Sequence, residues 1–202
     1  MKVVVFAKAP IPGQVKTRLA AALGAAGAAE LHRRLVRHTL EKALTAGVGP
    51  VELCCAPHAR HGFFADCAAA YGVTLTEQGE GDLGARMSRV FERGAPAVLI
   101  GCDAPALTAD DIAAAARALA AADVALTPAE DGGYMLIALR APAPEIFADI
   151  EWGGSDVARR TRDRIAASGL TLHELPMRWD VDRAADLARL AEHDARLLEG
   201  LA

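Results

Sequence analysis

The chain has 202 residues, which suits one domain with a substantial core, and we predict a single domain over residues 1–202. Its formal net charge is −4 and it has no long basic block, which disfavours non-specific nucleic-acid binding. Apolar residues make up 52% but aromatic residues only 4%, so we expect alanine-rich helices against Val- and Leu-rich strands, and no apolar run reaches the length of a membrane span.

The first predicted element is a strand at 3–7, inside an apolar stretch too short for a secretory signal peptide, so we expect a cytoplasmic protein. Further strands are predicted at 51–56, 73–76, 97–101, 124–127, 134–139 and 170–175, with a short one in RWDVD near the end of the chain. Helices are predicted at 30–46, 62–71, 83–93, 110–121, 156–167 and 184–198. This alternation predicts a three-layer α/β/α fold with a mostly parallel sheet. Ligands of such sheets bind beyond the carboxyl ends of the strands.

The segment after the first strand, KAPIPGQVKTRL at residues 8–19, carries three cations, two prolines and a glycine. It is not a Walker A loop, because proline and valine stand where that motif needs its two glycines. Two interpretations remain: a loop that binds phosphate through its side-chain cations, or a basic surface loop, since charge runs are usually solvated.

The segment after the third strand contains Gly-Glu-Gly-Asp-Leu-Gly at 79–84, which matches GxGxxG and opens a predicted helix. Asp103 follows about twenty residues later, as in a dinucleotide-binding fingerprint. Two features count against a Rossmann fold: the strand before the glycines alternates polar and apolar residues, and Asp103 lies in a tight Asp-Ala-Pro turn. The glycines would still let backbone amides approach a base or ribose closely.

Acidic residues follow two other predicted strands. Asp103 follows the strand at 97–101, and Asp180 and Asp182 lie in RWDVD. Asp103 alone fits a turn former that hydrogen-bonds its own backbone equally well. Carboxylates from two strand ends, however, are the ligands that Mg²⁺ or Mn²⁺ prefers beside phosphate oxygens. Together with the cations of the first loop, they would neutralise a diphosphate.

Five segments together resemble one known family. KAPIPGQVKTRL, GEGDLGARM, GCDAPALT, PAEDGGYMLIAL and DVDRAADL occur in this order in the bacterial glycosyltransferase-A-like proteins, once classed as a domain of unknown function and including members linked to arsenosugar biosynthesis. The chain is more distantly similar to 2-phospholactate guanylyltransferase and molybdenum-cofactor guanylyltransferase. The resemblance covers nearly the whole chain and implies a nucleotide-diphospho-sugar transferase fold.

The resemblance also implies roles for individual residues. The nucleotide phosphates would lie on the first loop, at Lys8, Gly13, Lys16 and Arg18. The base and ribose would lie on the loop that holds Gln78, Gly81, Asp82 and Gly84. The metal would be held by Asp103 and Asp182, with Asp180 as a competitor for the second place. Asp131, Gly132 and Gly133 would lie near the sugar or acceptor. Separately from the resemblance, the positions of Asp131 and Glu151 in the chain make one or the other the candidate general base.

We therefore expect a transferase that depends on Mg²⁺ or Mn²⁺ and takes a nucleotide or nucleotide-sugar and a small-molecule acceptor, with Asp103, Asp131, Lys16 and Arg18 as catalytic residues. Sugar transfer is favoured, because PAEDGG and ADIEWGGSD hold carboxylates and no lysine or arginine, and would repel a phosphorylated acceptor. One alternative is a nucleotidyltransferase of the 2-phospholactate guanylyltransferase type. Another is a catalytically inactive nucleotide-binding module, because the Asp-x-Asp of many sugar transferases is Asp-Ala-Pro here.

The six histidines show no metal-binding spacing, so no catalytic histidine is expected, and the four cysteines are expected to be reduced structural thiols.

Overall fold

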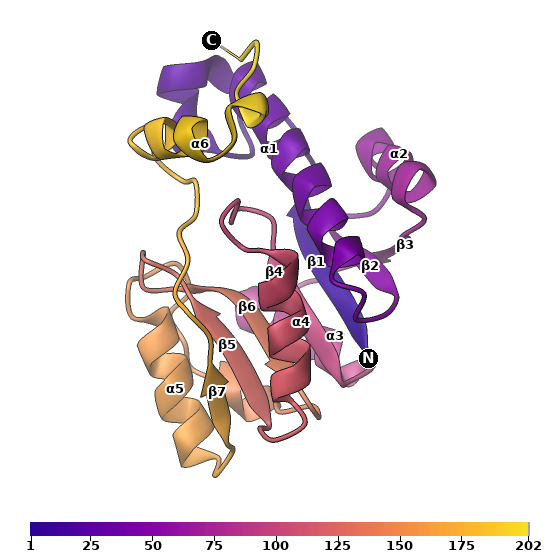
Figure 1. Ribbon diagram of the computed structural model, residues 1–202, viewed down its shortest axis with the longest axis vertical. Coiled ribbons are helices and arrows are strands. Elements are labelled where there is room, and N and C mark those ends of the chain that lie inside the picture. Colours follow the sequence, from indigo (N-terminus) through magenta and orange to yellow (C-terminus); the bar gives the residue numbers. More distant parts are fainter. Residues whose placement is uncertain (202) are drawn as a thin grey trace.

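The computed structural model describes residues 1–201, and its centre is a seven-stranded sheet in the order β3-β2-β1-β4-β6-β5-β7 (Figure 1). The strands are β1 (Lys2–Lys8), β2 (Val51–Ala56), β3 (Thr74–Glu77), β4 (Ala97–Gly101), β5 (Val124–Pro128), β6 (Tyr134–Leu139) and β7 (Leu172–Glu174). Every neighbouring pair is parallel except the two pairs of β6, which runs antiparallel to β4 and β5. The predicted mostly parallel α/β sheet is confirmed. The reversed β6 and this strand order differ from the Rossmann sheet considered as an alternative.

Helices cover both faces of the sheet, because each central strand buries side chains on both sides. In β1, Val3 and Val5 belong to one apolar cluster and Val4 to another, as the two-residue period of a strand requires. The first cluster is covered by α1 (Ala20–Thr45), α2 (Gly62–Tyr71) and α4 (Ala109–Ala118). The second is covered by α3 (Leu83–Glu92), η2 (Pro144–Phe147) and α5 (Val157–Ala167).

A third apolar cluster lies apart from the sheet, around the first half of α1. It joins this half of α1 and the preceding η1 (Thr17–Leu19) to the end of the chain, including α6 (Asp186–Asp194) and η3 (Ala195–Leu197). Helix α1 starts well before the predicted 30–46 and is kinked at Gly24, whose φ of 68° is non-helical. In Figure 1 this assembly is the upper part of the molecule. No helix within residues 1–201 has the length and apolarity that a membrane crossing requires.

The predicted strand in RWDVD is wrong. Only Arg178 makes a bridge, to Ala129, and the chain then runs as an extended segment from the sheet to the upper helices (Figure 1). The reason is packing, since Trp179 and Val181 bury their side chains in the third cluster. The backbone of this segment is still anchored, because the Val181 N–H donates to the Asp103 carbonyl at 2.9 Å. It thereby carries Asp180 and Asp182 to the carboxyl end of β4.

Candidate active site

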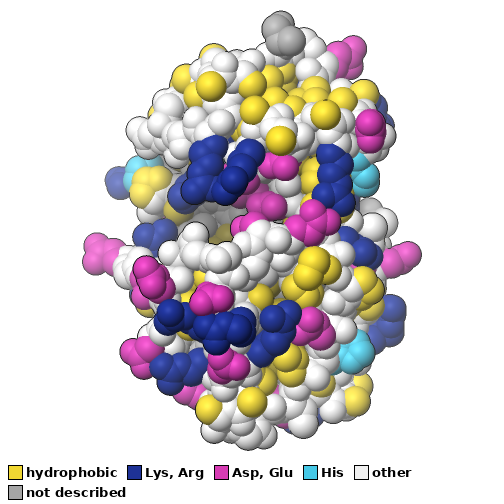
Figure 2. Space-filling view, turned by 90° about the vertical axis from the view of Figure 1, so that its left-hand side faces the viewer, with side chains coloured by type: hydrophobic (Ala, Val, Ile, Leu, Met, Phe, Trp, Pro, Cys, Tyr) yellow, Lys and Arg dark blue, Asp and Glu magenta, His cyan; other side chains and the backbone are white. Residues whose placement is uncertain are grey.

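A cleft of about 700 Å³ lies at the carboxyl ends of β1 and β4, on the side of the upper helices. Figure 2 shows the molecule hollowed across its middle, with basic and acidic side chains at the edge of the hollow. Eight of the residues predicted to act on the substrate or metal line the cleft: Lys8, Lys16, Arg18, Gln78, Asp103, Asp131, Asp180 and Asp182. Gly133 also lines it, whereas Glu151 is exposed and does not.

Lys16 is the buried centre of the first loop. Its backbone has the left-handed φ of 49°, and its side chain is only 4% exposed. The Lys16 ammonium lies 2.8 Å from Asp103 Oδ1 and also donates to the Val181 carbonyl. Lys16 therefore ties the first loop to the end of β4 and to the extended segment, instead of projecting into solvent as a free phosphate ligand.

The electrostatics of this ion pair keep both groups charged. Burial acts to lower the pKa of Lys16, but the charge of Asp103 and its hydrogen bond outweigh burial and raise this pKa. Burial likewise acts to raise the pKa of Asp103, yet the charge of Lys16 and its hydrogen bond bring this pKa below its usual value. Half of the Asp103 side chain remains exposed to the cleft. Asp103 is thus an ionised carboxylate with one oxygen bound to Lys16.

Arg18 and Asp182 form a second ion pair, at the rim of the cleft. Both side chains are substantially exposed, at 65% and 39%. The Asp182 backbone N–H is bound by the Asp186 carboxylate at 2.9 Å. Asp182, predicted as the second metal ligand, therefore has its carboxylate on Arg18, a predicted phosphate ligand. An exposed pair of this kind separates readily, because it contributes about 1 kcal/mol at most.

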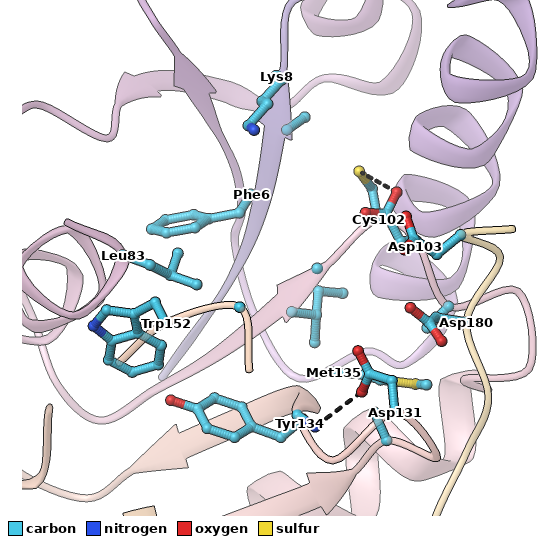
Figure 3. Close-up of a pocket in the computed structure, with 18 of the residues that line it drawn as sticks. Phe6, Lys8, Leu83, Cys102, Asp103, Asp131, Tyr134, Met135, Trp152 and Asp180 are labelled. Carbon is cyan, nitrogen blue, oxygen red and sulfur yellow. Dashed lines mark hydrogen bonds between the residues drawn. The ribbon is translucent and has the colours of Figure 1, made fainter. Parts of the chain in front are cut away.

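Two carboxylates of the cleft, Asp180 and Asp131, have no ion-pair partner within residues 1–201, and Asp180 is the one whose pKa is shifted. Burial, and next the charge of Asp131, raise the pKa of Asp180 to about 6, and Asp103 adds to the effect. Asp131 accepts the Gly133 N–H at 2.9 Å on its Oδ1. Figure 3 shows the side chains of Asp103, Asp131 and Asp180 directed toward a shared space. Mutual repulsion among carboxylates favours a cation between them. The donor atoms of these three do not all lie within 4.8 Å of one another among residues 1–201, so metal binding here, like that predicted for Asp103 with Asp182, stays a prediction.

The predicted base-binding loop has mainly structural contacts. Gln78 is buried, and its amide nitrogen faces the Ala7 and Cys54 carbonyls at 3.4 and 3.0 Å. Asp82 caps α3 by accepting the Ala85 N–H at 2.8 Å. Of this loop, Gln78 and Leu83 line the cleft, and the Gln78 amide has only its oxygen left for a base.

The predicted nucleotide-binding glycines do not line the cleft either. Gly84 lets α3 pack closely, because a Cβ there would lie 2.7 Å from Trp152 Cζ2. Gly81 and Gly13 have φ values of +95° and +80°, which a turn with glycine accommodates. Chain geometry alone therefore accounts for glycine at these three positions, and their contact with a nucleotide stays a prediction.

Sequence patterns missed several cleft residues. His32 reaches the cleft from α1, where it interrupts a buried apolar stripe, and this interruption was the available signal. Arg86 reaches it from α3, and its Nε donates to the Gly81 carbonyl at 2.9 Å. Tyr134 and Trp152, to which the sequence analysis gave no role, form an aromatic wall with their rings 6.5 Å apart at 82° (Figure 3).

This sheet, with its cleft at the strand ends, defines an α/β protein of the nucleotide-diphospho-sugar transferase and nucleotidyltransferase fold class. The chain belongs to the bacterial family described as "Uncharacterized protein conserved in bacteria (DUF2064)", whose model matches residues 39–154. No curated protein matches the chain.

Three solved structures illustrate the likeness. A protein from Desulfovibrio desulfuricans G20, described as a "putative nucleotide-diphospho-sugar transferase", is 29% identical with a TM-score of 0.84, over 99% of this chain and 91% of the other. A nucleotidyl transferase from Methanothermobacter is 16% identical with a TM-score of 0.63, over 97% and 98%. The inositol-1-phosphate CTP transferase from T. maritima is 11% identical with a TM-score of 0.62, over 100% and 97%. The last two show the fold alone.

Proposed function

We propose that this protein is a metal-dependent glycosyltransferase that moves a sugar from a nucleoside diphosphate to a hydroxyl of a small, uncharged acceptor. The transferase class is supported by the solved structures of the same fold. The choice of sugar transfer over nucleotidyl transfer is supported by the charges of the cleft.

The observation that carries the proposal is the uneven distribution of charge in the cleft. The cations of its lining come from the first loop, the end of β1 and α3, namely Lys8, Lys16, Arg18 and Arg86. The opposite wall, contributed by residues 129–157, presents Asp131 and the aromatic rings but no lysine or arginine. Arg159, in the next turn of α5, is bound by Asp156 and Asp163 and does not line the cleft. A phosphorylated acceptor would meet carboxylates there, whereas a neutral sugar or alcohol would not.

The carboxylates suit a divalent cation, with Asp103 and Asp180 as its holders and Asp131 beside them. When bound, such a cation would stabilise the negative charge that develops on the departing diphosphate. Lys16 keeps Asp103 ionised and fixed in position. Arg18, once it leaves Asp182, and Lys8 are placed to hold the phosphates.

In the transfer, the acceptor hydroxyl oxygen forms a bond to the anomeric carbon, and the bond from this carbon to the diphosphate oxygen breaks. The hydroxyl proton passes to the free oxygen of Asp131, whose other oxygen is held by the Gly133 N–H. Tyr134 and Trp152 offer ring faces to the sugar or acceptor. The rate enhancement would come chiefly from fixed charges that meet the leaving group.

Thermal unfolding with Mn²⁺ and a panel of nucleotides and nucleotide-sugars tests the proposal. A ligand at a hundred times its dissociation constant adds about 2.7 kcal/mol to the free energy of unfolding. We expect such a shift for at least one nucleotide-sugar, its loss in Asp103→Asn, and its retention in the control Asp66→Asn, which changes an exposed carboxylate of α2. No shift with any nucleotide would refute the proposal. A shift without product in a turnover assay would favour the nucleotide-binding module.

A further inference from the structure

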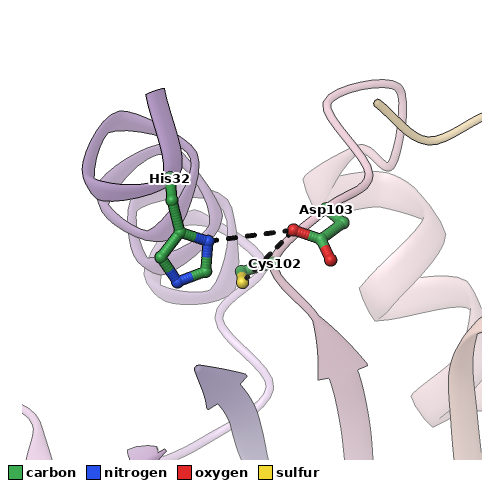
Figure 4. Close-up of side chains that lie close together, drawn as sticks. All are labelled: His32, Cys102 and Asp103. Atoms are coloured by element: carbon green, nitrogen blue, oxygen red, sulfur yellow. Dashed lines mark hydrogen bonds and ion pairs between the residues drawn. The ribbon is translucent and has the colours of Figure 1, made fainter. Parts of the chain in front are cut away.

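Three donor atoms of different chemistry meet at the inner end of the cleft. His32 comes from α1, and Cys102 and Asp103 follow β4 (Figure 4). His32 Nδ1 lies 4.0 Å and Cys102 Sγ 3.8 Å from Asp103 Oδ1, and all three atoms lie within 4.8 Å of one another. This group is separate from the carboxylate pair Asp131 and Asp180, and it contains the thiol and the imidazole that a hard cation avoids.

The orientation of His32 shows that its free nitrogen faces this group. His32 Nε2 lies 3.0 Å from the Lys8 carbonyl, which only accepts, so Nε2 carries the hydrogen and donates. Nδ1 is therefore a lone-pair nitrogen. It is buried without a hydrogen-bond partner in the part of the chain described, and its side chain is only 5% exposed. A histidine whose N–H is held by a backbone carbonyl while the other nitrogen is free has the arrangement typical of a metal-binding imidazole.

We propose that His32, Cys102 and Asp103 form a binding site for Zn²⁺, which shares Asp103 with the hard-cation site of the transferase proposal. Imidazole, thiolate and carboxylate are the three ligand types that Zn²⁺ takes in proteins. Bond lengths of about 2.0–2.3 Å place tetrahedral ligands about 3.3–3.6 Å apart, so the two distances to Asp103 Oδ1, 4.0 and 3.8 Å, need to shorten by roughly 0.2–0.7 Å. All three residues line the cleft, which gives the ion a path of entry and leaves its fourth position to water. The Cys102 thiol releases its proton to solvent when the ion binds.

Lys16 determines the consequence of zinc binding. Its ammonium lies on the same Asp103 oxygen, at 2.8 Å, so Zn²⁺ and Lys16 compete for this atom. An ion at the site displaces Lys16 from Asp103 and withdraws Asp103 from the set that would hold Mg²⁺ or Mn²⁺. If the proposed transfer takes place in the cleft, Zn²⁺ inhibits it. The affinity of the site for Zn²⁺ is limited because the ion must displace Lys16.

Titration with Co²⁺, a spectroscopic substitute for Zn²⁺, tests the site without any transferase assay. We expect a thiolate-to-cobalt charge-transfer band in the near ultraviolet, which Zn²⁺ abolishes and Mg²⁺ does not. Cys102→Ser should remove the band, and His32→Gln should weaken Co²⁺ binding by at least about tenfold. The controls Cys67→Ser, a buried thiol on α2, and His173→Gln, an exposed histidine on β7, should bind as the wild type does. A missing band in the wild type, or a band that persists in Cys102→Ser, would refute the site.

The variant Lys16→Met gives a test with the opposite sign. Removal of the competing ammonium should tighten Co²⁺ and Zn²⁺ binding, by about tenfold or more if the lysine contributes about 1.4 kcal/mol of competition. Unchanged or weaker binding would contradict the shared use of Asp103 Oδ1. Asp180→Asn separates the two metal proposals, because it should keep the cobalt band while losing Mn²⁺-dependent nucleotide binding. A wild-type protein that shows the cobalt band but no nucleotide response would count against the transferase proposal and leave the zinc site standing.

Discussion

Asp180→Asn should make the metal-free protein more stable at pH 7, although it removes a carboxylate from the cleft. Asp180 is partly buried and has no cation partner among residues 1–201. Burial and the nearby charge of Asp131 raise the pKa of Asp180 from 3.8 to about 6. An asparagine has nearly the same size and never ionises, so the repulsion disappears.

The magnitude follows from the difference in pKa between the folded and unfolded chains. A change of one in pKa corresponds to about 1.4 kcal/mol, so the upper limit for Asp180 is about 3 kcal/mol. Partial exposure to solvent reduces this value, and we expect a gain of about 1–2 kcal/mol for Asp180→Asn at pH 7. Because the folded chain holds the proton more tightly, wild-type stability should be highest below pH 4 with respect to this group. It should then fall as the pH rises from 4 to 6.

Urea unfolding of wild type and variant between pH 4 and pH 8, with EDTA present, measures both effects. The difference between the two proteins should be small at pH 4, grow through pH 6 and stay constant above it. With saturating Mn²⁺ the order should reverse, since the cation stabilises only the wild type. A variant that is less stable than wild type at pH 7 without metal would refute the electrostatic account of Asp180.

Three further predictions concern the scaffold and are each measured by chemical unfolding. Gly84→Ala should destabilise the fold by about 1–3 kcal/mol, because the new methyl group would meet Trp152 at 2.7 Å; unchanged stability would show that α3 can move away. Asp111→Ala should lower the free energy of unfolding by about 2–3 kcal/mol, because it removes both hydrogen bonds from Arg178 to Asp111, at 2.7 and 2.9 Å. Asp111→Glu should recover only part of this loss. A loss under about 0.5 kcal/mol in Asp111→Ala would contradict the importance of this pair. Burial lowers the pKa of Lys42 to about 8, so between pH 8 and pH 10 the unfolded chain binds more protons than the folded chain, and the free energy of unfolding should rise with pH. Lys42→Met should flatten this rise. A wild-type stability that does not change between pH 8 and pH 10 would contradict the prediction.

Local patterns predicted the sheet well because its strands are continuous apolar runs bounded by turn residues. Strands β2, β4 and β6 match their predicted bounds, and β1 differs by one residue at each end. The structure of the last part of the chain could not be predicted from local patterns in this way. In RWDVD, alternating apolar side chains suggest a strand, but Trp179 and Val181 pack on α1, which lies far away in the sequence. No local pattern contains this partner.

The cleft shows the same division between local and long-range information. Strand ends indicated where Lys16 and Asp103 gather, because the carboxyl ends of parallel strands meet at one edge, whereas Asp180 reaches the same cleft from an extended segment that is not a strand. The pairing of Lys16 with Asp103, and of Arg18 with Asp182, depends on side-chain directions across more than eighty residues of sequence. Residue type and spacing do not contain these directions.

The glycines illustrate a third limit of the sequence. Gly84 belongs to a pattern typical of nucleotide-binding loops, yet its immediate contacts are with Trp152 and η2. Both functions require a residue without a side chain. Residue type alone therefore cannot separate close helix packing from close approach to a ligand.

Product analysis tests the proposed sugar transfer most directly. The protein is incubated with Mn²⁺, each nucleotide-sugar or nucleoside triphosphate in turn, and a fraction of small neutral metabolites from a bacterial extract, and the products are identified by mass spectrometry. We predict release of a nucleoside diphosphate from one nucleotide-sugar, dependent on an acceptor that gains the sugar mass, and loss of this activity in Asp103→Asn and Asp131→Asn but not in Asp66→Asn. Release of pyrophosphate from a triphosphate, with transfer of the nucleotide to a phosphorylated acceptor, would contradict it.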